Sequence, residues 1–520
     1  MSQDSSEKPK VEGHAGRQKD RAAEIANTFE WLITAFILAF VFRAFVMEAF
    51  RIPTGSMAST LMGAHFRVRC PQCGYEYQHG FSPRDYGMGE DSVPAGSQQM
   101  PPTRCPSCNH FPPGGPPVSV ANGDRILVLK CIYQFFDPRR WDVIVFKNPL
   151  EPQINYIKRL VALPGETVEI IDGDVYIDGQ IVRKPPKVQR ELWMPVYDHD
   201  FQPIKPKEPT FSMQYNRPWV QPFRTADSDW DIPPDHPTVF QLDSDPGDRQ
   251  TMHYDSGGDL DFRATYAYNA VREYPYLPYC SDLMVRFYVQ AFRPEGQIGV
   301  ELSKYDVTYR GWVDFNGQMV IAREEEDGSE TVLNSKPLDS AATIAAETAP
   351  LRFANVDHQL ILEFGDEQLH FDLGRDANDA GTIREDVPPH AAVFGAGELA
   401  LLHVAVFRDI HYTRTKYAGS TEIGRGTQDN PFTLGDDQFF VLGDNSPNSQ
   451  DSRWWESPGI GNAGGQYDMG VVPRDYLVGK ALFVYWPSGF KPFARFPLAA
   501  IPNVGKMRFI YGGSDDTLTH

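Results

Sequence analysis

The sequence is poor in cysteine and in positive charge, and each of these two shortages excludes a class of protein. Long apolar runs are also few. Six cysteines in 520 residues are too few for a disulfide scaffold of this size. The 49 Lys and Arg residues are outnumbered by 69 Asp and Glu residues, and the net charge of -20 argues against a general nucleic-acid binder. The 43 Gly, 43 Pro and 12% aromatic residues are typical of turn-rich, β-leaning folded material. The chain is also too long for one ordinary domain, and no internal repeat is evident.

One long apolar run is present, near the N-terminus. Residues 1–21 before it are polar and without apolar periodicity, so we expect a disordered tail there. Residues 31–42 carry no charge, and their apolar flanks extend them to a predicted transmembrane helix over 22–47. The alternatives are a buried core helix and a cleaved signal peptide, and no small-x-small cleavage site follows the run. Basic residues before the run predict a cytoplasmic N-terminus and a single-pass anchor, with the remainder of the chain outside.

A serine is presented directly after this run. Ile52 and Pro53 favour an extended backbone, because proline fixes its own φ and keeps its predecessor out of the α region. Gly55 then permits a tight turn or a close approach, which leaves the hydroxyl of Ser56 presented. Most serines in such turns only bond their own backbone, so the meaning of Ser56 depends on the rest of the chain.

Two Cys-x-x-Cys pairs indicate a metal site. They are Cys70 with Cys73 and Cys105 with Cys108. Two such hairpins supply a tetrahedral set of four thiolates suited to Zn²⁺, whereas a pair of redox disulfides is the alternative. Because cysteine occupies all four positions, the predicted zinc is structural rather than catalytic. The sequence leaves the state of Cys131 and Cys280 open.

A lysine interrupts an apolar strand at residues 155–162. Burial of an ammonium group is costly unless the group is paired or neutral. Lys158 therefore either points to solvent on the polar face of the strand or is a desolvated amine able to act as a general base. An ordinary lysine, with a pKa of ~10.4, is almost wholly protonated at pH 7. Lowering that pKa by ~3 units costs about 4 kcal/mol, which burial can supply.

Near the far end, a hydrophobic strand at 439–442 runs into a polar loop, residues 443–453. The Asp451-x-Arg453 pair in this loop suits a hydrogen-bonded segment at the edge of a site. A polar turn or a Ca²⁺ loop would fit the same residues.

Taken in order after a membrane anchor, these segments resemble the type I signal peptidases, or leader peptidases, which are membrane-anchored Ser-Lys proteases. Residues 52–57 resemble the nucleophile box of that family, and residues 123–128 resemble its following strand box. Residues 156–166 resemble the general-base box, and residues 443–454 the last box. Two departures are that Ser59 stands where the family usually has proline and that Ser446-Pro447 interrupts its usual Arg-Asp.

The resemblance implies the catalytic roles. Ser56 would attack the scissile carbonyl while neutral Lys158 takes its proton. The backbone N–H of Ser56 and the hydroxyl of Thr54 would form the oxyanion hole. Ser449 would hydrogen-bond the lysine amine and orient it. No cofactor is expected for catalysis.

The resemblance also implies supporting and substrate-binding residues. Asp451 and Arg453 would pair to hold the loop that carries Ser449, with further support from Asp444 and Arg159. The substrate-binding residues would be Phe50, Ile52, Pro53 and Ile157. The expected partners are membrane lipid and signal peptides of the Ala-x-Ala type on exported preproteins, without nucleic acid. The expected location is the cytoplasmic (inner) membrane, with the catalytic domain on the outer, periplasmic side.

A long insertion and a short one depart from this family pattern. Many short strands at regular spacing between 184 and 431 predict a β-sandwich, without a sugar-site or Ca²⁺ motif. The predicted fold is therefore mainly β. Its parts are a cytoplasmic tail (1–21), a transmembrane helix (22–47), a peptidase core (48–66, 118–183 and 432–505), a four-cysteine zinc-ribbon-like insertion (67–117), an inserted β-sandwich-like domain (184–431) and a C-terminal tail (506–520).

Two other functions fit parts of the sequence. The first is a membrane-tethered binding protein that uses the zinc ribbon and the sandwich, with an inactive peptidase core. The second is a self-cleaving Ser-Lys regulator of the repressor type, against which the anchor and the lack of a DNA-binding module argue. The favoured interpretation is a membrane-bound serine endopeptidase.

Overall fold

The computed structural model describes residues 21–89, 92–94, 96–111, 116–211, 217–233, 235–255, 262–338, 348–384, 387–416, 419–461, 465–488 and 503–513. Residues 1–20 and 514–520 lie outside the described residues, and so does nearly all of the predicted cytoplasmic tail. The chain divides into two units, Met1–Glu48 and Ala49–His520.

The first unit is an apolar helix. Helix α1 (Arg21–Val41) continues into a π-helical turn, η1 (Phe42–Val46). The segment Glu24–Val46 is 23 residues long with a mean hydropathy of 1.9, which is long and apolar enough to cross a membrane. A signal sequence near an N-terminus meets the same criterion.

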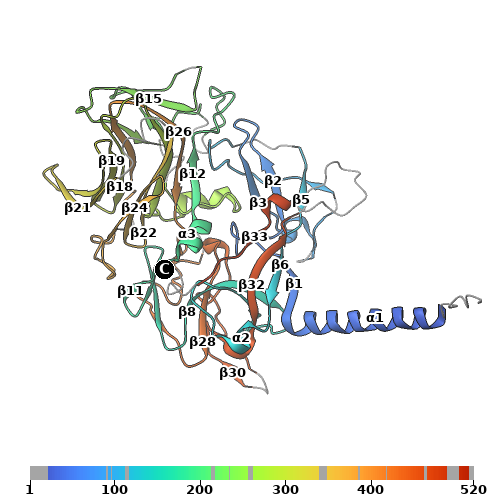
Figure 1. Ribbon diagram of the computed structural model, residues 1–520. Helices are drawn as coiled ribbons and strands as arrows, with labels where there is room; N and C mark the ends of the chain where they lie inside the picture. The colour runs from blue at the N-terminus through green and yellow to red at the C-terminus, as the bar shows by residue number, and fades with distance from the viewer. Residues whose placement is uncertain are drawn as a thin grey trace, which may run out of the picture. The chain divides into compact units, whose positions relative to one another are not determined.

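An eight-stranded sheet forms the body that carries the Ser56 and Lys158 segments (Figure 1). Its order is β1-β6-β32-β7-β8-β28-β31, with β33 paired to β32. The strands are β1 (Met47–Arg51), β6 (Arg125–Leu129), β7 (Val143–Lys147), β8 (Asn155–Ala162), β28 (Gln438–Leu442), β31 (Val472–Pro473), β32 (Leu477–Trp486) and β33 (Arg508–Phe509). Strand β33 lies beyond residue 505, so the sheet extends further along the chain than the predicted end of the core.

A second, four-stranded sheet packs against this body. Its order is β11-β10-β9-β27. The strands are β9 (Thr167–Ile171), β10 (Asp174–Ile177), β11 (Gln180–Ile181) and β27 (Phe432–Thr433). The two sheets share a buried apolar cluster that includes Val161 of β8, Val168 of β9 and Phe440 of β28.

The long insertion forms two sheets that lie face to face. One has the order β14-β15-β26-β17-β22-β23-β24, with β12 paired to β26, and the other β13-β16-β25-β18-β19-β20-β21. The strands of the first are β12 (Met194–Asp198), β14 (Trp230–Asp231), β15 (Val239–Asp243), β17 (Leu283–Ala291), β22 (Ala349–Val356), β23 (Gln359–Phe364), β24 (Glu367–Asp372) and β26 (Glu398–Arg408). Those of the second are β13 (Phe223–Arg224), β16 (Gln250–Tyr254), β18 (Gln297–Lys304), β19 (Val307–Asp314), β20 (Gln318–Glu324), β21 (Glu330–Pro337) and β25 (Ala391–Ala396).

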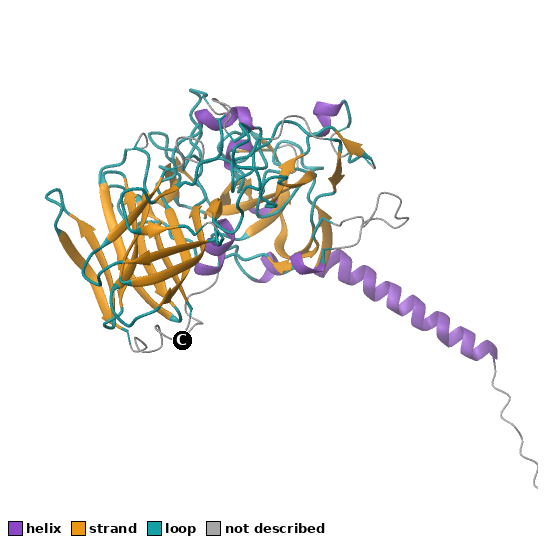
Figure 2. Ribbon diagram, turned by 90° about the horizontal axis from the view of Figure 1, so that it is seen from above, coloured by secondary structure: helices purple, strands orange, loops and turns teal. Residues whose placement is uncertain are grey.

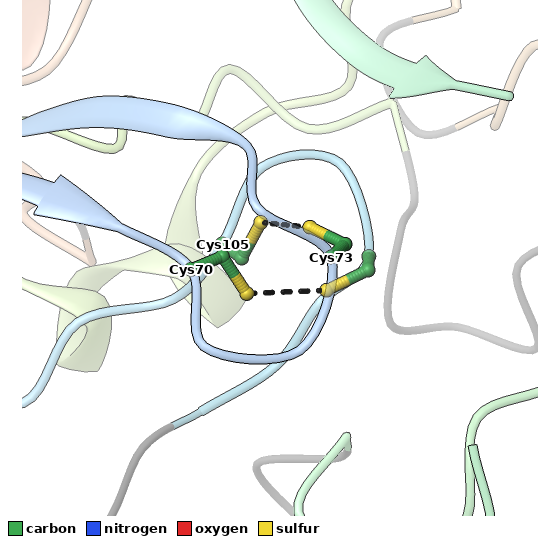
Figure 3. Close-up of side chains that lie close together, drawn as sticks. Cys70, Cys73 and Cys105 are labelled. Atoms are coloured by element: carbon green, nitrogen blue, oxygen red, sulfur yellow. Dashed lines mark hydrogen bonds between the residues drawn. The ribbon is translucent and has the colours of Figure 1, made fainter. Parts of the chain in front are cut away.

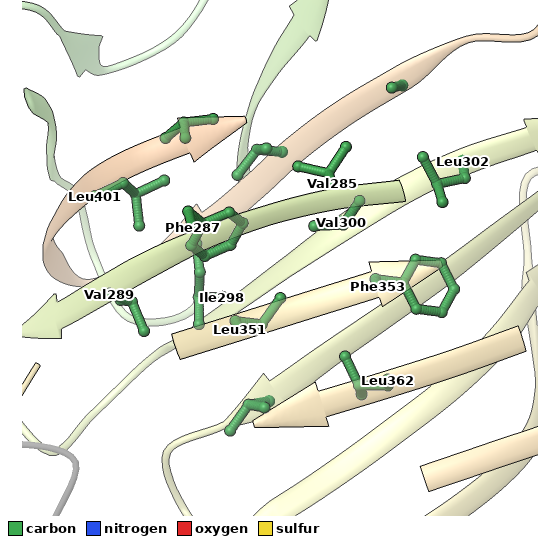
Figure 4. Close-up of a cluster of buried hydrophobic side chains, with 14 of the residues drawn as sticks. Val285, Phe287, Val289, Ile298, Val300, Leu302, Leu351, Phe353, Leu362 and Leu401 are labelled. Carbon is green, nitrogen blue, oxygen red and sulfur yellow. The ribbon is translucent and has the colours of Figure 1, made fainter. Parts of the chain in front are cut away.

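Strand alternation builds the core between these two sheets. In β17, buried and exposed side chains alternate from Val285 to Ala291, so that Val285, Phe287 and Val289 point inward. They meet Ile298 and Val300 of the opposite sheet (Figure 4). The result is a continuous apolar layer of the kind that holds β-sandwiches together.

A third, smaller part carries the cysteines. Its sheet has the order β3-β2-β5-β4, with β2 (His65–Arg69), β3 (Glu76–Gly80), β4 (Ser97–Gln98) and β5 (Val118–Ala121). The remaining short elements include helices α2 (Ile132–Phe135) and α3 (Pro186–Leu192) and the strand pair β29 (Gly459–Ile460) and β30 (Gln466–Tyr467).

The prediction of a mainly β protein with an N-terminal apolar helix is confirmed, as Figure 2 shows by the dominance of strands. Residues near both ends of the predicted insertion, 184–431, pack into the core of the rest of the chain. Val188 and Leu192 of α3, and Ile410 and Tyr412 after β26, belong to the apolar cluster shared by the eight-stranded and four-stranded sheets. The insertion is therefore interleaved with its host rather than attached beside it.

Candidate active site

The side chains of Ser56 and Lys158 meet in the structure. Ser56 lies in the turn after β1, and Lys158 lies on β8. These two strands are not neighbours in the sheet. Lys158 Nζ is 2.8 Å from Ser56 Oγ and 3.0 Å from the carbonyl oxygen of Ile157. The Lys158 side chain does not face solvent, because the residue is only 4% exposed.

Burial makes this amine bind its proton less tightly than an ordinary lysine does. Desolvation lowers the pKa of Lys158 from 10.5 to about 8, and the positive charge of Arg453 acts in the same direction. The negative charges of Asp451 and Asp444 oppose the shift and keep the pKa from falling further. A substantial fraction of the amine is therefore neutral near pH 8, as a general base requires.

Backbone hydrogen bonds and buried side chains stabilise the turn that carries Ser56. Ile52 donates its N–H to the carbonyl of Asp124 at 2.8 Å, and Leu61 donates to Met57 at 2.7 Å. Met57 and Leu61 are fully buried in the cluster beneath the sheet. The side chain of Thr54, expected at the oxyanion hole, is exposed.

Two buried ion pairs stand next to the lysine. Arg159 donates two hydrogen bonds to Asp444, at 2.8 and 2.7 Å, and Arg453 donates two to Asp451, at 2.9 and 2.8 Å. All four side chains have no solvent exposure. Asp451 also accepts the N–H of Gly443, and so the pair fixes the start of the loop, as the sequence predicts.

The expected hydrogen bond from Ser449 to the lysine amine is absent. Its hydroxyl is buried and has no hydrogen-bond partner. It lies against the α-carbon of Gly443, on the side where a Cβ would stand. The prediction was wrong in this contact because loop sequence does not determine which staggered position a buried hydroxyl takes.

Comparison with known proteins finds a family for part of the chain. The signal peptidase family, peptidase S26, matches residues 111–236 and 406–486, which include Lys158 and the Asp444–Arg453 loop but begin after Ser56. Signal peptidase I of Rickettsia canadensis (strain McKiel) is 26% identical over 157 residues, which are 30% of this chain and 44% of the relative. The chain carries a signal peptidase domain.

A second relative matches a shorter stretch. Probable signal peptidase I-1 of Synechocystis sp. (strain ATCC 27184 / PCC 6803 / Kazusa) is 44% identical over 69 residues, 12% of this chain and 35% of the relative. The chain thus matches less than half the length of either relative. Among solved structures, the carbohydrate-binding module CBM66 from Bacillus subtilis is similar with a TM-score of 0.23 and 11% identity, over 36% of this chain and 96% of that one.

An open backbone edge runs beside the signal peptidase site. Strand β28 pairs with β8 only from Arg159 to Ala162, so residues 155–158 have no partner strand on that side within the part of the chain that the structure describes. Strand β1 is the outermost strand of the same sheet. Ile52 and Ile157, both buried, share one apolar cluster, Phe50 packs against it, and Pro53 is exposed.

The four cysteines of the short insertion converge on one point (Figure 3). The Sγ atoms of Cys70 and Cys108 are 3.6 Å apart, as are those of Cys73 and Cys105. That distance is far from a disulfide bond of about 2.05 Å. It is close to the edge of about 3.8 Å of a tetrahedron with Zn–S bonds of about 2.3 Å. The donor set therefore fits a closed tetrahedral metal site.

The two cysteine turns have the same backbone form. In each, the N–H of the first cysteine is hydrogen-bonded to the carbonyl of the residue five positions later, Cys70 to Tyr75 and Cys105 to His110, both at 2.9 Å. Gly74 and Asn109 close the turns with positive φ angles of 78° and 68°. This repeated geometry aims all four thiolates inward.

A buried charge cluster joins the signal peptidase body to the sandwich. Four carboxylates lie within 4.8 Å of one another, those of Asp174, Asp282, Asp357 and Asp409. Lys184 pairs with Asp357 and Asp409, and Lys304 pairs with Asp282 and lies 3.8 Å from Asp174. The two ammonium groups are within ion-pair distance of all four carboxylates, so the cluster is an internal ion-pair network.

Sequence reasoning missed the residues of segment 262–282 that reach the site. Tyr266 donates its hydroxyl to the carbonyl of Asp444 at 3.0 Å, and the side chain of Asn269 is hydrogen-bonded to that of Asn445. These contacts join positions that are 178 and 176 residues apart in the chain. No periodicity or motif in the insertion signals them.

Proposed function

We propose that the protein is a membrane-anchored serine endopeptidase that removes N-terminal signal peptides from exported preproteins. The observation that carries the proposal is the 2.8 Å separation of Ser56 Oγ from the buried amine of Lys158. A buried neutral amine beside a hydroxyl is the arrangement that a Ser-Lys nucleophile and base require.

In the proposed mechanism, neutral Lys158 takes the proton of Ser56 as Oγ attacks the scissile carbonyl. The ammonium then gives this proton to the leaving amine, and an acyl-enzyme ester remains on Ser56. Lys158 next takes a proton from the water that attacks the ester and gives it to Oγ of Ser56 as the acyl–Oγ bond breaks, which releases the new carboxyl group and restores Ser56. The Ser56 N–H, with the Thr54 hydroxyl after rotation toward the site, stabilises the oxyanion.

The signal peptide would bind as an added strand. The open side of residues 155–158 and the outer edge of β1 offer backbone groups to an extended chain. Phe50, Ile52 and Ile157 would shape the small apolar pockets that select Ala-x-Ala ends. Bilayer lipid would surround α1, with the N-terminus in the cytoplasm and the catalytic body on the periplasmic side of the inner membrane.

Zinc would be held by the four cysteines and would have a structural role. The loop between the two turns is poor in apolar residues, so metal binding would supply much of its folding free energy. With four thiolate ligands the metal has no open position for substrate, and the proposed chemistry does not pass through it.

The test is cleavage of a preprotein by the full-length protein in detergent. Ser56→Ala and Lys158→Ala should each abolish cleavage, because each removes one partner of the proton transfer. Ser59→Ala in the same turn and Lys147→Ala on β7 are matched controls, since both residues are exposed. Unchanged cleavage by the first two variants would instead favour a membrane-tethered binding protein with an inactive peptidase core.

A further inference from the structure

Asn445 holds the two carbonyl groups next to the nucleophile. Its backbone N–H donates to the carbonyl of Ser56 at 3.0 Å, and its side-chain Nδ2 donates to the carbonyl of Gly55, also at 3.0 Å. The carbonyl of Gly55 and the N–H of Ser56 belong to one planar trans peptide group and point in opposite directions. Whatever fixes this carbonyl therefore also fixes the direction of the Ser56 N–H, the proposed oxyanion donor.

Asn269, from the long insertion, fixes the side-chain amide of Asn445. Each of the two amides donates to the oxygen of the other at 2.8 Å, and the residues are only 3% and 1% exposed. An amide group can rotate by 180° and exchange its oxygen and nitrogen, unless its partners distinguish them. The carbonyl of Gly55 can only accept, so it selects the orientation in which Nδ2 of Asn445 faces it, and Asn269 stabilises that orientation by donating to Oδ1 of Asn445. The reversed amide would place two oxygens against each other.

The segment that carries Asn269 is itself anchored on the chain after the Ser56 turn and on strand β3 of the cysteine-bearing part. Tyr268 donates its hydroxyl to the carbonyl of Ala64 at 2.8 Å, and its own carbonyl accepts the N–H of Gly80 at 2.9 Å. The ring of Tyr268 occupies the position where a Cβ on Gly55 would stand. A backbone peptide flip at Gly55 is therefore opposed from the insertion side as well.

We infer that Asn269 is a positioning residue for the oxyanion hole. Acting through Asn445, it holds the Gly55–Ser56 peptide group in the orientation that directs the Ser56 N–H at the developing oxyanion. The long insertion is thus part of the catalytic apparatus and not only an appendage. This inference rests on the proposed Ser-Lys peptidase function.

The experiment measures kcat and KM of the full-length protein in detergent with a fluorogenic signal-peptide substrate. We expect Asn269→Ala to lower kcat about tenfold with KM changed less than about twofold, since an oxyanion contact forms only in the transition state. The affinity for a peptide aldehyde, whose hemiacetal oxygen occupies the hole, should fall by a similar factor. The pH midpoint of kcat/KM should not move, because Lys158 is untouched. Arg272→Ala, an exposed change in the same segment, is the matched control and should match the wild type.

A double-mutant cycle separates positioning from general damage to the fold. If Asn269 acts through Asn445, the double variant Asn269→Ala/Asn445→Ala should be no slower than Asn445→Ala alone. Multiplicative effects, or an Asn269→Ala protein with wild-type kcat, would overturn the inference. Asn269→Leu, which keeps the number and branching of the side-chain heavy atoms and removes both hydrogen bonds, gives the same test should the alanine variant not fold. Wild-type cleavage by Ser56→Ala would refute the proposed function itself, whereas an inactive Ser56→Ala beside a fully active Asn269→Ala would refute only this inference.

Discussion

The buried amine of Lys158 should set the pH dependence of the enzyme. Burial lowers its pKa from 10.5 to about 8, a difference that corresponds to about 3 kcal/mol. At pH 7, a base with a pKa near 8 is neutral in about 9% of molecules, compared with about 0.03% for an ordinary lysine. The structure therefore accounts for an increase of about 300-fold in the active form at neutral pH.

The sign of the effect follows from the charge of the reacting form. Only the neutral amine can take the Ser56 proton, so kcat/KM should rise with pH and level off above 8 to 9. Below pH 8 it should fall about tenfold for each pH unit. The assay is cleavage of a fluorogenic signal peptide in detergent from pH 6 to 10, with circular dichroism to confirm that the fold persists.

Two results would refute this reasoning. One is a kcat/KM that stays flat from pH 9 to pH 6 while the protein remains folded. The other is substantial activity in Lys158→Arg, because a guanidinium stays protonated at every pH in this range. Lys147→Ala, which alters an exposed lysine on β7, should leave the profile unchanged.

Three further predictions concern metal, ion pairs and buried histidine. Purified protein should hold one zinc per chain by elemental analysis, and Cys70→Ser should lower both the zinc content and the melting temperature; wild-type protein that folds without metal would contradict this. Asp444→Asn should lower the free energy of unfolding, measured with denaturant, by about 3–5 kcal/mol, because it leaves Arg159 charged and buried without its partner. An unchanged denaturation midpoint would show that the pair contributes little. Burial lowers the pKa of His411 from 6.5 to about 3, and the charge of Arg408 acts in the same direction. The free energy of unfolding should therefore decrease as the pH falls from 6.5 toward 3, with a contribution from His411 of about 2 kcal/mol at pH 5. His411→Phe should reduce the drop in unfolding free energy between pH 7 and pH 5 by that amount, and an identical drop in both proteins would exclude His411 as a source.

Local sequence predicted the parts of the site that depend on local chemistry. The Asp-x-Arg spacing in the last box indicated the Asp451–Arg453 pair, because two side chains so close in a short loop can reach each other. The apolar residues around Lys158 left both a solvent-facing and a buried amine open. The orientation of Ser449 could not be predicted, since several rotamers satisfy the same loop. The partnership of Asn269 with Asn445 could not be predicted either. It depends on the path of an inserted segment that returns to the site between β16 and β17, and tertiary packing alone determines that path.

The charge network between β10 and the sandwich limits how this chain can be shortened. Lys304 comes from the insertion and pairs with Asp282 of the same part, while Asp174 comes from the host sheet and would lose the nearby ammonium of Lys304 if the sandwich were removed. A buried carboxylate left in this way costs several kcal/mol, comparable to the whole stability of many domains. Excision of the sandwich should thus yield an insoluble remnant and not a minimal peptidase.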